Sequence, residues 1–383
     1  MKRTALTLIA ATTLLAGGVV SSGPAIAGGR HTPAPPPART IADGLFTPLS
    51  LAIDDHGRAL VSQNFLGELL RITPDGQKTT IATAPGEELG AVSTRGKTIY
   101  WGTTGQDPAA PSAKLYSQRK NGTPREIADL RAFEEANNPD QDTTYGFRDL
   151  PQSCADQFPA DNPASYTGMV DSHPYASYAG RNKLYVADAG ANAILSVRTN
   201  KRHATPRVVA TLPAVGATAT AEVLEAQGLP TCAAGHTYYF EFVPTDVEQG
   251  GDGWLYVTSL PGGPEDASLG ARGAVYKVNP YTGRVRLVAD GFVGAVNLAL
   301  GPDGTIAVAE LFGGEGGVGQ VTLVKPWSSR RTYLPLTAPG ALEWVGSKRH
   351  SKLYATTDAF VPGPEGPQPI GKLQVVKFRS HRH

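Results

Sequence analysis

Short apolar or alternating runs, separated by turns rich in glycine and proline, recur along the chain, and residues 291–324 show this pattern most clearly. They read GFVGAVNLALGPDGTIAVAELFGGEGGVGQVTLV, with runs at 296–300, 305–310 and 320–324. Runs of this length with Gly, Pro or Asp at their ends are typical of β-strands. The Gly-Pro-Asp-Gly turn at 301–304 is tight enough to make its flanking strands antiparallel neighbours. The segment is therefore expected to form a β-meander.

Units of this kind recur six times, and such repetition indicates a solenoid, propeller or array. The runs that open the six units lie at 49–53, 90–93, 174–177, 242–247, 296–300 and 341–345. The sixth unit lacks a fourth run, whereas an isolated run at 40–45, TIADGL, resembles the fourth-strand sequence LVADGF at 287–292. An N-terminal strand that completes the last sheet would close a ring and remove its exposed edges. We therefore predict an all-β, six-bladed β-propeller, because an open solenoid would leave the isolated run unexplained.

Two longer segments, at about 129–171 and 213–241, interrupt the repeat. Asp129 is expected to cap a short amphipathic helix, and the rest of both insertions reads as irregular chain. Antiparallel alternation places both insertions on the same face of the ring as the long loops between second and third strands. Function on a rigid scaffold usually lies in such loops, so this face is the expected site.

Residues 1–27 read as a secretory signal peptide, since Lys2 and Arg3 precede an apolar stretch at 5–20 and an Ala-Ile-Ala motif ends at Ala27. We expect cleavage after Ala27 and export to the extracellular space. No other run is long enough to cross a bilayer. The remaining boundaries are a proline-rich disordered spacer at 28–38, one propeller domain at 39–379 and a tail at 380–383.

Charge and cysteine content narrow the functional classes. The formal net charge is +1, and removing the signal peptide with Lys2 and Arg3 brings it to −1, without any basic run. Nucleic-acid binding is therefore not expected. Cys154 and Cys232 are the two cysteines, and an oxidising compartment favours a disulfide between them. We expect a monomer.

Polar residues at the starts of first strands and the ends of second strands are expected to gather at the mouth of the central channel. They are Asn64, Asp171, His173, Asp188, Asp246, Asn297, Glu310 and Asp358. Carboxylate and amide oxygens suit a hard cation such as Ca²⁺, with Asp188 and Glu310 as first candidates for its ligands. For any single residue, strand capping or hydrogen bonding to loop backbone or channel water is the simpler interpretation. His173 could be a general base, a metal ligand or a hydrogen-bonded loop residue, and no catalytic residue is assigned.

Four segments resemble the ScyD/ScyE family of secreted bacterial proteins. They are IADLRAFEEANNPDQ at 127–141, DSHPYASYAGRNKLYVADAGANAILSV at 171–197, VPTDVEQGGDGWLYVTSLPGG at 243–263 and GPDGTIAVAEL at 301–311. The resemblance covers most of the chain beyond the signal peptide and implies export and a propeller related to NHL-repeat and gluconolactonase-like proteins. It implies no settled catalytic activity.

The departures from the family pattern fall on the expected channel mouth. His173 stands where the family usually has Asn, Asp246 where Gly is usual, and Asn297 in place of a common Asp. Residues 46–48, Phe-Thr-Pro, occupy the place of the Glu-Gly-Pro motif that supplies a metal-binding Glu in gluconolactonase-like enzymes. These differences indicate a diverged ligand and weaken a hydrolase interpretation.

Three functions are compatible with the sequence. The first is a secreted binding module for a small molecule, glycan or protein, which uses the loop-rich face. The second is a Ca²⁺-dependent lactonase or esterase-like hydrolase at the channel mouth, and the third is a structural envelope protein. A propeller by itself does not decide among them.

Overall fold

The computed structural model describes residues 37–119, 122–326, 328–348 and 350–379. The predicted signal peptide, all but the last two residues of the spacer, and the tail at 380–383 lie outside this part of the chain. Among the described residues, no helix combines the length and apolarity needed to cross a membrane.

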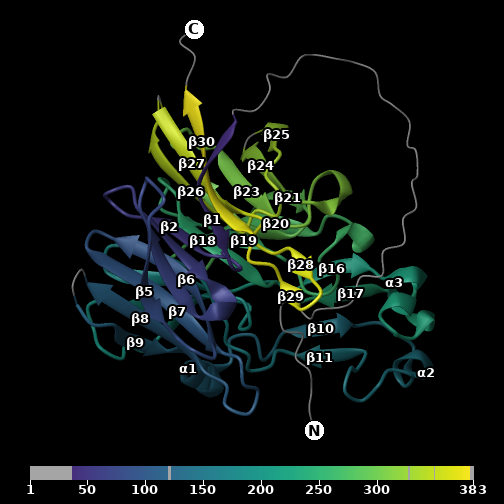
Figure 1. Ribbon diagram of the computed structural model, residues 1–383. Coiled ribbons are helices and arrows are strands. Elements are labelled where there is room, and N and C mark those ends of the chain that lie inside the picture. The colour runs from purple at the N-terminus through teal and green to yellow at the C-terminus, as the bar shows by residue number, and fades with distance from the viewer. Residues whose placement is uncertain (1–36, 120–121, 327, 349, 380–383) are drawn as a thin grey trace, which may run out of the picture.

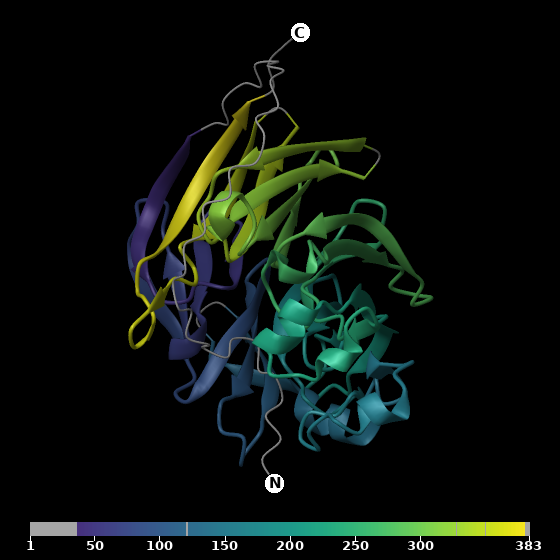
Figure 2. The same cartoon turned by 90° about the vertical axis from the view of Figure 1, so that its right-hand side faces the viewer.

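Six four-stranded antiparallel sheets follow one another along the chain and form the blades (Figures 1 and 2). Blade one contains β2 (Leu51–Ile53), β3 (Ala59–Gln63), β4 (Glu68–Ile72) and β5 (Lys78–Thr83). Blade two contains β6 (Glu87–Arg95), β7 (Thr98–Gly105), β8 (Ala113–Arg119) and β9 (Arg125–Asp129). Blade three contains β12 (Pro174–Ala179), β13 (Lys183–Asp188), β14 (Ala193–Arg198) and β15 (Arg207–Thr211).

The second half of the ring repeats this order. Blade four contains β18 (Pro244–Gln249), β19 (Leu255–Ser259), β20 (Gly273–Val278) and β21 (Val285–Phe292). Blade five contains β22 (Ala295–Leu300), β23 (Ile306–Glu310), β24 (Gln320–Lys325) and β25 (Ser328–Leu334). Blade six contains β26 (Ala341–Ser347), β27 (His350–Thr357), β30 (Gly371–Arg379) and the N-terminal β1 (Ala38–Leu45).

The pairing of β1 with β30 closes the ring. The two strands are antiparallel, with Ala38 opposite Val376 and Leu45 opposite Gly371, and the purple β1 lies beside the yellow β30 in both views (Figures 1 and 2). The first strands of the blades contact their neighbours around a complete circle, from β2 through β26 and back to β2. The predicted six-bladed propeller and its closing strand are confirmed.

Apolar side chains hold neighbouring blades together. Six of the seven buried clusters each lie between two adjacent blades, including the pair formed by blades six and one. Leu184 of blade three and Leu115 of blade two, for example, are both fully buried in one such cluster. Each blade therefore has an apolar face on both sides, which explains the nearly continuous apolar runs of its inner strands.

The tight turns between first and second strands explain how the repeat was visible in the sequence. In blade one the Asp54 carboxylate accepts hydrogen bonds from the backbone N–H groups of His56 and Arg58. Gly57 has a φ of 73°, in the left-handed region that favours glycine. Gly304 has a φ of 81° at the matching turn of blade five.

The two insertions form a sheet of their own, which the sequence did not predict. The strands β10 (Thr144–Phe147), β11 (Ser165–Thr167), β16 (Val215–Thr218) and β17 (Thr237–Phe240) are arranged in the order β11-β10-β17-β16. The helices are α1 (Leu130–Asn137), α2 (Gln152–Ala155) and α3 (Ala221–Ala226). Asp129 caps α1 by accepting a hydrogen bond from the N–H of Ala132, as expected. A seventh apolar cluster, which contains Phe147 and Leu224, lies within the insertions.

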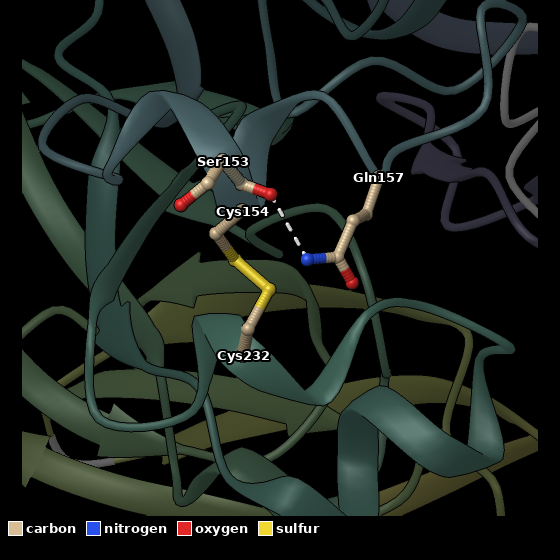
Figure 3. The surroundings of a disulfide bond; sticks show 4 residues. All are labelled: Ser153, Cys154, Gln157 and Cys232. Atoms are coloured by element: carbon tan, nitrogen blue, oxygen red, sulfur yellow. Dashed lines mark hydrogen bonds between the residues drawn. A yellow bond between two sulfur atoms is a disulfide. The ribbon is translucent and has the colours of Figure 1, made fainter.

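The remaining short elements lie in connections. They are η1 (Asn64–Leu66), η2 (Thr231–Ala233), η3 (Ala267–Leu269), η4 (Glu315–Gly317), β28 (Pro362–Gly363) and β29 (Gly366–Pro367). The predicted disulfide is present, and it joins Cys154 in α2 to Cys232 in η2 across a sequence separation of 78 residues (Figure 3). The Gln157 side chain donates a hydrogen bond to the Ser153 carbonyl beside it. The disulfide thus ties one insertion to the other.

Candidate binding site at the channel mouth

His173 and Glu88 form an ion pair between two neighbouring blades. His173 directly precedes β12, and Glu88 lies at the start of β6, so both are at the ends of first strands that face the insertions. The Nε2 of His173 lies 3.3 Å from Oε2 of Glu88, and the two side chains are 14% and 13% exposed. Burial disfavours the imidazolium, but the hydrogen bond and charge of Glu88, with the charges of Asp171 and Asp188, outweigh it and raise the pKa of His173.

Asp188 explains the position of His173. It ends β13 and is fully buried, and its carboxylate accepts hydrogen bonds from the His173 N–H at 2.6 Å and the Ser172 hydroxyl at 2.8 Å. Burial raises the pKa of Asp188, although these hydrogen bonds oppose the shift. The carboxylate therefore fixes the backbone before β12 and leaves the imidazole ring of His173 to face Glu88.

Tyr175 lies beside this pair, and Glu265 acts on Tyr175 through its charge. The rings of His173 and Tyr175 meet edge to face, with centroids 6.1 Å apart. Burial, followed by the charges of Glu265, Glu88 and Asp246, raises the pKa of Tyr175. Burial also raises the pKa of Glu265, which lies in the loop before η3. We call Glu88, His173, Tyr175 and Glu265 the mouth cluster.

Two of the predicted site residues, Asp246 and Asn297, bond to the backbone of the next blade, and a third, Asn64, is buried within its own blade. Asp246, which is 4% exposed, accepts hydrogen bonds from the N–H of Leu298 in the next blade and from that of Val247. Asn297 accepts one from the N–H of Leu342 in blade six, at 2.7 Å. Asn64 is 3% exposed and accepts a hydrogen bond from the Ser62 hydroxyl.

The three others have different surroundings. Glu310 is 3% exposed, and its carboxylate accepts hydrogen bonds from the Val293 N–H and from the side chains of Gln320 and Thr322. Asp358 forms an ion pair with Lys372 at 2.9 Å. Asp171 is exposed, and its backbone N–H donates to Glu134. Of the eight predicted residues, His173 is the one that pairs with a side chain of the neighbouring blade, and Asp171 is the one with an exposed side chain.

The predicted metal ligands Asp188 and Glu310 end second strands of blades three and five, between which blade four lies. Both carboxylates are occupied by the hydrogen bonds described above. In the described ranges, no group of three or more His, Cys, Asp or Glu side chains is placed to hold a metal ion. The pairing of Asp188 with Glu310 stays a prediction without support from their surroundings.

A second acidic group, which the sequence analysis did not select, comes from β18 and β26. Burial and the charge of Asp246 raise the pKa of Glu343 to about 8, and burial with the charges of Glu343 and Asp246 raises that of Glu248. The pKa of Asp246 itself rises to about 7, because burial outweighs the hydrogen bonds from Leu298 and Val247. Because their folded-state pKa values are raised, these carboxyl groups favour folding at low pH, and this contribution is lost as the pH rises through about 8.

Replacement of Glu343 by Gln should therefore stabilise the protein above neutral pH. We expect the free energy of unfolding to rise by about 2 kcal/mol at pH 8 and to change little at pH 4. The value at pH 8 is smaller than the full pKa shift implies, because solvent screens a partly exposed side chain. Denaturant unfolding of wild type and variant across this pH range measures the effect. Glu315→Gln, at an exposed position in η4, is the control, and an equal gain at both pH values would contradict the assignment.

An open hollow of about 580 Å³ lies on the insertion sheet. Its lining residues are Asp142, Thr143, Thr144, Phe147, Arg148 and Ser165. They come from β10, from β11 and from the residues on either side of β10, and none belongs to the mouth cluster. The hollow is therefore separate in composition from the candidate site.

Comparisons with known proteins support the fold. No protein-family model matches the sequence, and no curated protein matches it either. The PQQ-bound aldose sugar dehydrogenase of Streptomyces coelicolor is similar in structure, with a TM-score of 0.53 and 14% identity over 90% of this chain and 99% of that one. A putative glucose dehydrogenase from Thermus thermophilus gives 0.50 and 15% identity over 89% of this chain and 100% of that one. A putative gluconolactonase has a TM-score of 0.50 and 13% identity over 92% of this chain and 96% of that one. At these identities the similarity establishes a shared six-bladed β-propeller fold and no activity.

Proposed function

We propose that this protein is a secreted binding propeller that holds a small ligand at the mouth cluster. The observation that carries the proposal is the His173–Glu88 pair, because its side chains are partly exposed and the ring of His173 is not used to satisfy buried backbone. Glu88 and Glu265 give this cluster an acidic character, and the Tyr175 hydroxyl can donate or accept a hydrogen bond. A ligand with a protonated amine or several hydroxyl groups complements these side chains.

Exposed apolar side chains on the loops of the same face favour a ligand that also has an apolar part. They are Leu66 at 50%, Met169 at 40%, Val318 at 57% and Ile370 at 42% exposure. They lie in the connections between second and third strands or, for Met169, in the first insertion. Apolar side chains on a polar loop surface often mark binding sites. The proposed ligand is therefore amphipathic, with its polar end in the mouth cluster.

The disulfide and the resemblance to ScyD/ScyE proteins support export, and neither favours a particular reaction. The alternative of a Ca²⁺-dependent lactonase or esterase at the channel mouth has less support, since the proposed metal ligands are occupied by hydrogen bonds. In such a reaction His173, held by Glu88, would be the residue that gives up or takes up a proton. Turnover of a bound ester or lactone that is lost in His173→Asn would favour this alternative.

Ligand binding should depend on the acidic side chains of the mouth cluster. We expect a thermal-shift screen of amines, amino sugars and neutral glycosides to find stabilising compounds, and binding of a hit to weaken at least tenfold in Glu88→Gln, because a charged hydrogen bond is lost. Calorimetric titration measures the affinity. Glu126→Gln, which changes an outer ion pair with Lys114, is the matched control. Preferential binding of anionic compounds, or unchanged affinity in Glu88→Gln and Glu265→Gln, would refute the proposal.

A further inference from the structure

Three side-chain oxygens at the end of helix α1 are buried without a hydrogen-bond partner among the described residues. They are Oε2 of Glu134, Oδ1 of Asn138 and Oδ1 of Asp140. Glu134 and Asp140 are each only 1% exposed. Buried acceptors without partners are rare because each one loses its hydration without compensation. Three of them within seven residues therefore call for a physical explanation.

The other polar atom of each side chain is held in place. Oε1 of Glu134 accepts a hydrogen bond from the Asp171 N–H at 3.0 Å, and the amide nitrogen of Asn138 donates to the Gly168 carbonyl at 2.9 Å. Oδ2 of Asp140 accepts hydrogen bonds from the Tyr145 hydroxyl at 2.8 Å and the Asn192 amide at 2.9 Å. These hydrogen bonds fix the orientation of the three side chains. The unpartnered oxygens therefore cannot find a partner by rotation of the side chain without breaking a bond.

All three side chains face the same short segment, residues 168–171. Asn138 and Glu134 bond to its two ends, Gly168 and Asp171. Oδ1 of Asp140 lies so close to Gly168 that a Cβ atom at this position would come within 2.1 Å of it. Asp140 thus packs directly against the backbone of Gly168, and any side chain at position 168 would displace its carboxylate.

Acidic side chains outnumber basic ones in this region, where the nearby cation is Arg131, whose guanidinium donates a hydrogen bond to the Val170 carbonyl at 3.3 Å and pairs with Glu135. The acidic side chains whose charges act on Glu134 include Asp188, Asp171 and Asp140. Burying carboxylates that lack a cation costs several kcal/mol. A cation bound by these oxygens would offset the negative charge and take the place of their missing hydrogen-bond partners.

We propose that Glu134, Asn138 and Asp140 bind a divalent cation, with Ca²⁺ the best match to a donor set made only of oxygens. Ca²⁺ accepts irregular arrangements of carboxylate, amide, carbonyl and water oxygens, whereas Mg²⁺ demands a near-ideal octahedron. The site has two carboxylates and one amide. It therefore has less negative charge than a site with three acidic ligands, and no group of three or more His, Cys, Asp or Glu placed to hold a metal is found among the described residues. We therefore expect an affinity in the range of extracellular modules, with a Kd of about 10⁻⁴–10⁻³ M.

The site would act as a clamp between the first insertion and blade three. Asp140 is bonded to Asn192, which follows β13, and Glu134 to the backbone of Asp171, two residues before His173. A cation here would therefore stabilise the approach to the mouth cluster without contacting a ligand. This inference does not depend on the proposed function, because the three side chains lie outside the mouth cluster.

Titration of the chelator-treated, disulfide-bonded protein with CaCl₂ alone tests the proposal. We expect calorimetric binding and a rise of about 2–5 °C in Tm at several millimolar Ca²⁺, with a smaller effect of MgCl₂. Glu134→Gln combined with Asp140→Asn should abolish both effects, while Glu135→Gln, at an exposed neighbour on α1, should leave them unchanged. Absence of binding in wild type, or an unchanged Ca²⁺ shift in the double variant, would overturn the proposal.

A second measurement does not require replacement of any ligand. Tb³⁺ in a Ca²⁺ site is excited through nearby tyrosines, and Tyr145 is hydrogen-bonded to Asp140 while its ring lies 5.5 Å from that of Tyr166. Tyr145→Phe combined with Tyr166→Phe should remove most of the sensitised emission without a large change in the Tb³⁺ titration midpoint. Emission that stays at the wild-type level would show that the ion binds elsewhere.

Discussion

A chain that begins at Thr47 and so lacks β1 should lose its cooperative thermal transition and aggregate. Without β1, the backbone of β30 becomes an exposed sheet edge, which is a template for pairing between molecules. Leu45 and Ala42 would also leave the buried cluster between blades six and one, where they are 0% and 7% exposed. Circular dichroism during heating and size-exclusion chromatography measure both effects, and a chain that begins at Pro37 serves as the control.

Two further experiments separate ring closure from a general effect of truncation. A peptide of residues 38–45 added in excess should restore part of the soluble fraction, because it can occupy the vacant edge. Leu45→Ala in the chain that begins at Pro37 should cost about 2–5 kcal/mol, as for other buried leucines. Asp43→Ala at an exposed position should cost little. A truncated chain with the wild-type Tm would show that the ring is stable when open.

The ring could be predicted because its determinants are local. Each blade has short apolar strands, and glycine turns such as the one at Gly57 are visible as a repeated pattern. Even the long-range contact between β1 and β30 was predictable, since the repeat left one strand too few at the C-terminus and one too many at the N-terminus. The number of strands in the repeat thus predicted the pairing of β1 with β30, although neither strand alone indicates its partner.

The insertion sheet was missed because it lacks such a pattern. Its strands β10 and β17 contain only four residues each and come from different insertions, so nothing near either strand indicates its partner. Pairing between Gly146 and Tyr239 is a non-local contact that a single sequence does not reveal. The aromatic residues at 238–240, in the sequence TYYF, were the available signal for a strand.

For the candidate site, the repeat indicated which residues lie at strand ends but not what their side chains contact. Position in the repeat correctly placed His173 at the start of a first strand, but it could not show that the Asp246 and Asn297 side chains point toward neighbouring backbone. Glu88 was missed because it lies in the adjacent blade, and its contact with His173 depends on the spacing between blades. A Glu-Glu pair at the start of β6 was the only signal in the sequence.

Replacement of both Cys154 and Cys232 by Ala should destabilise the insertions by roughly 4 kcal/mol. This value follows from the chain entropy that the disulfide removes from an unfolded loop of this length, with a sequence separation of 78 residues. The insertions have a small apolar core of their own, around Phe147, Leu224 and Ala233, so they depend more on the disulfide than the blades do. Hydrogen exchange followed by mass spectrometry should show faster exchange in β10, β11, β16 and β17.

Exchange in the blades distinguishes local from global destabilisation. The six clusters between blades do not include Cys154 or Cys232, so β19 and β23 should keep their wild-type protection while the insertion sheet loses it. Because Asp140 bonds to Asn192 of blade three, the loss of protection should extend to the residues after β13. Reduction of the wild-type disulfide should reproduce this pattern, and a uniform increase of exchange in all six blades would show instead that the insertions and the ring unfold as one unit.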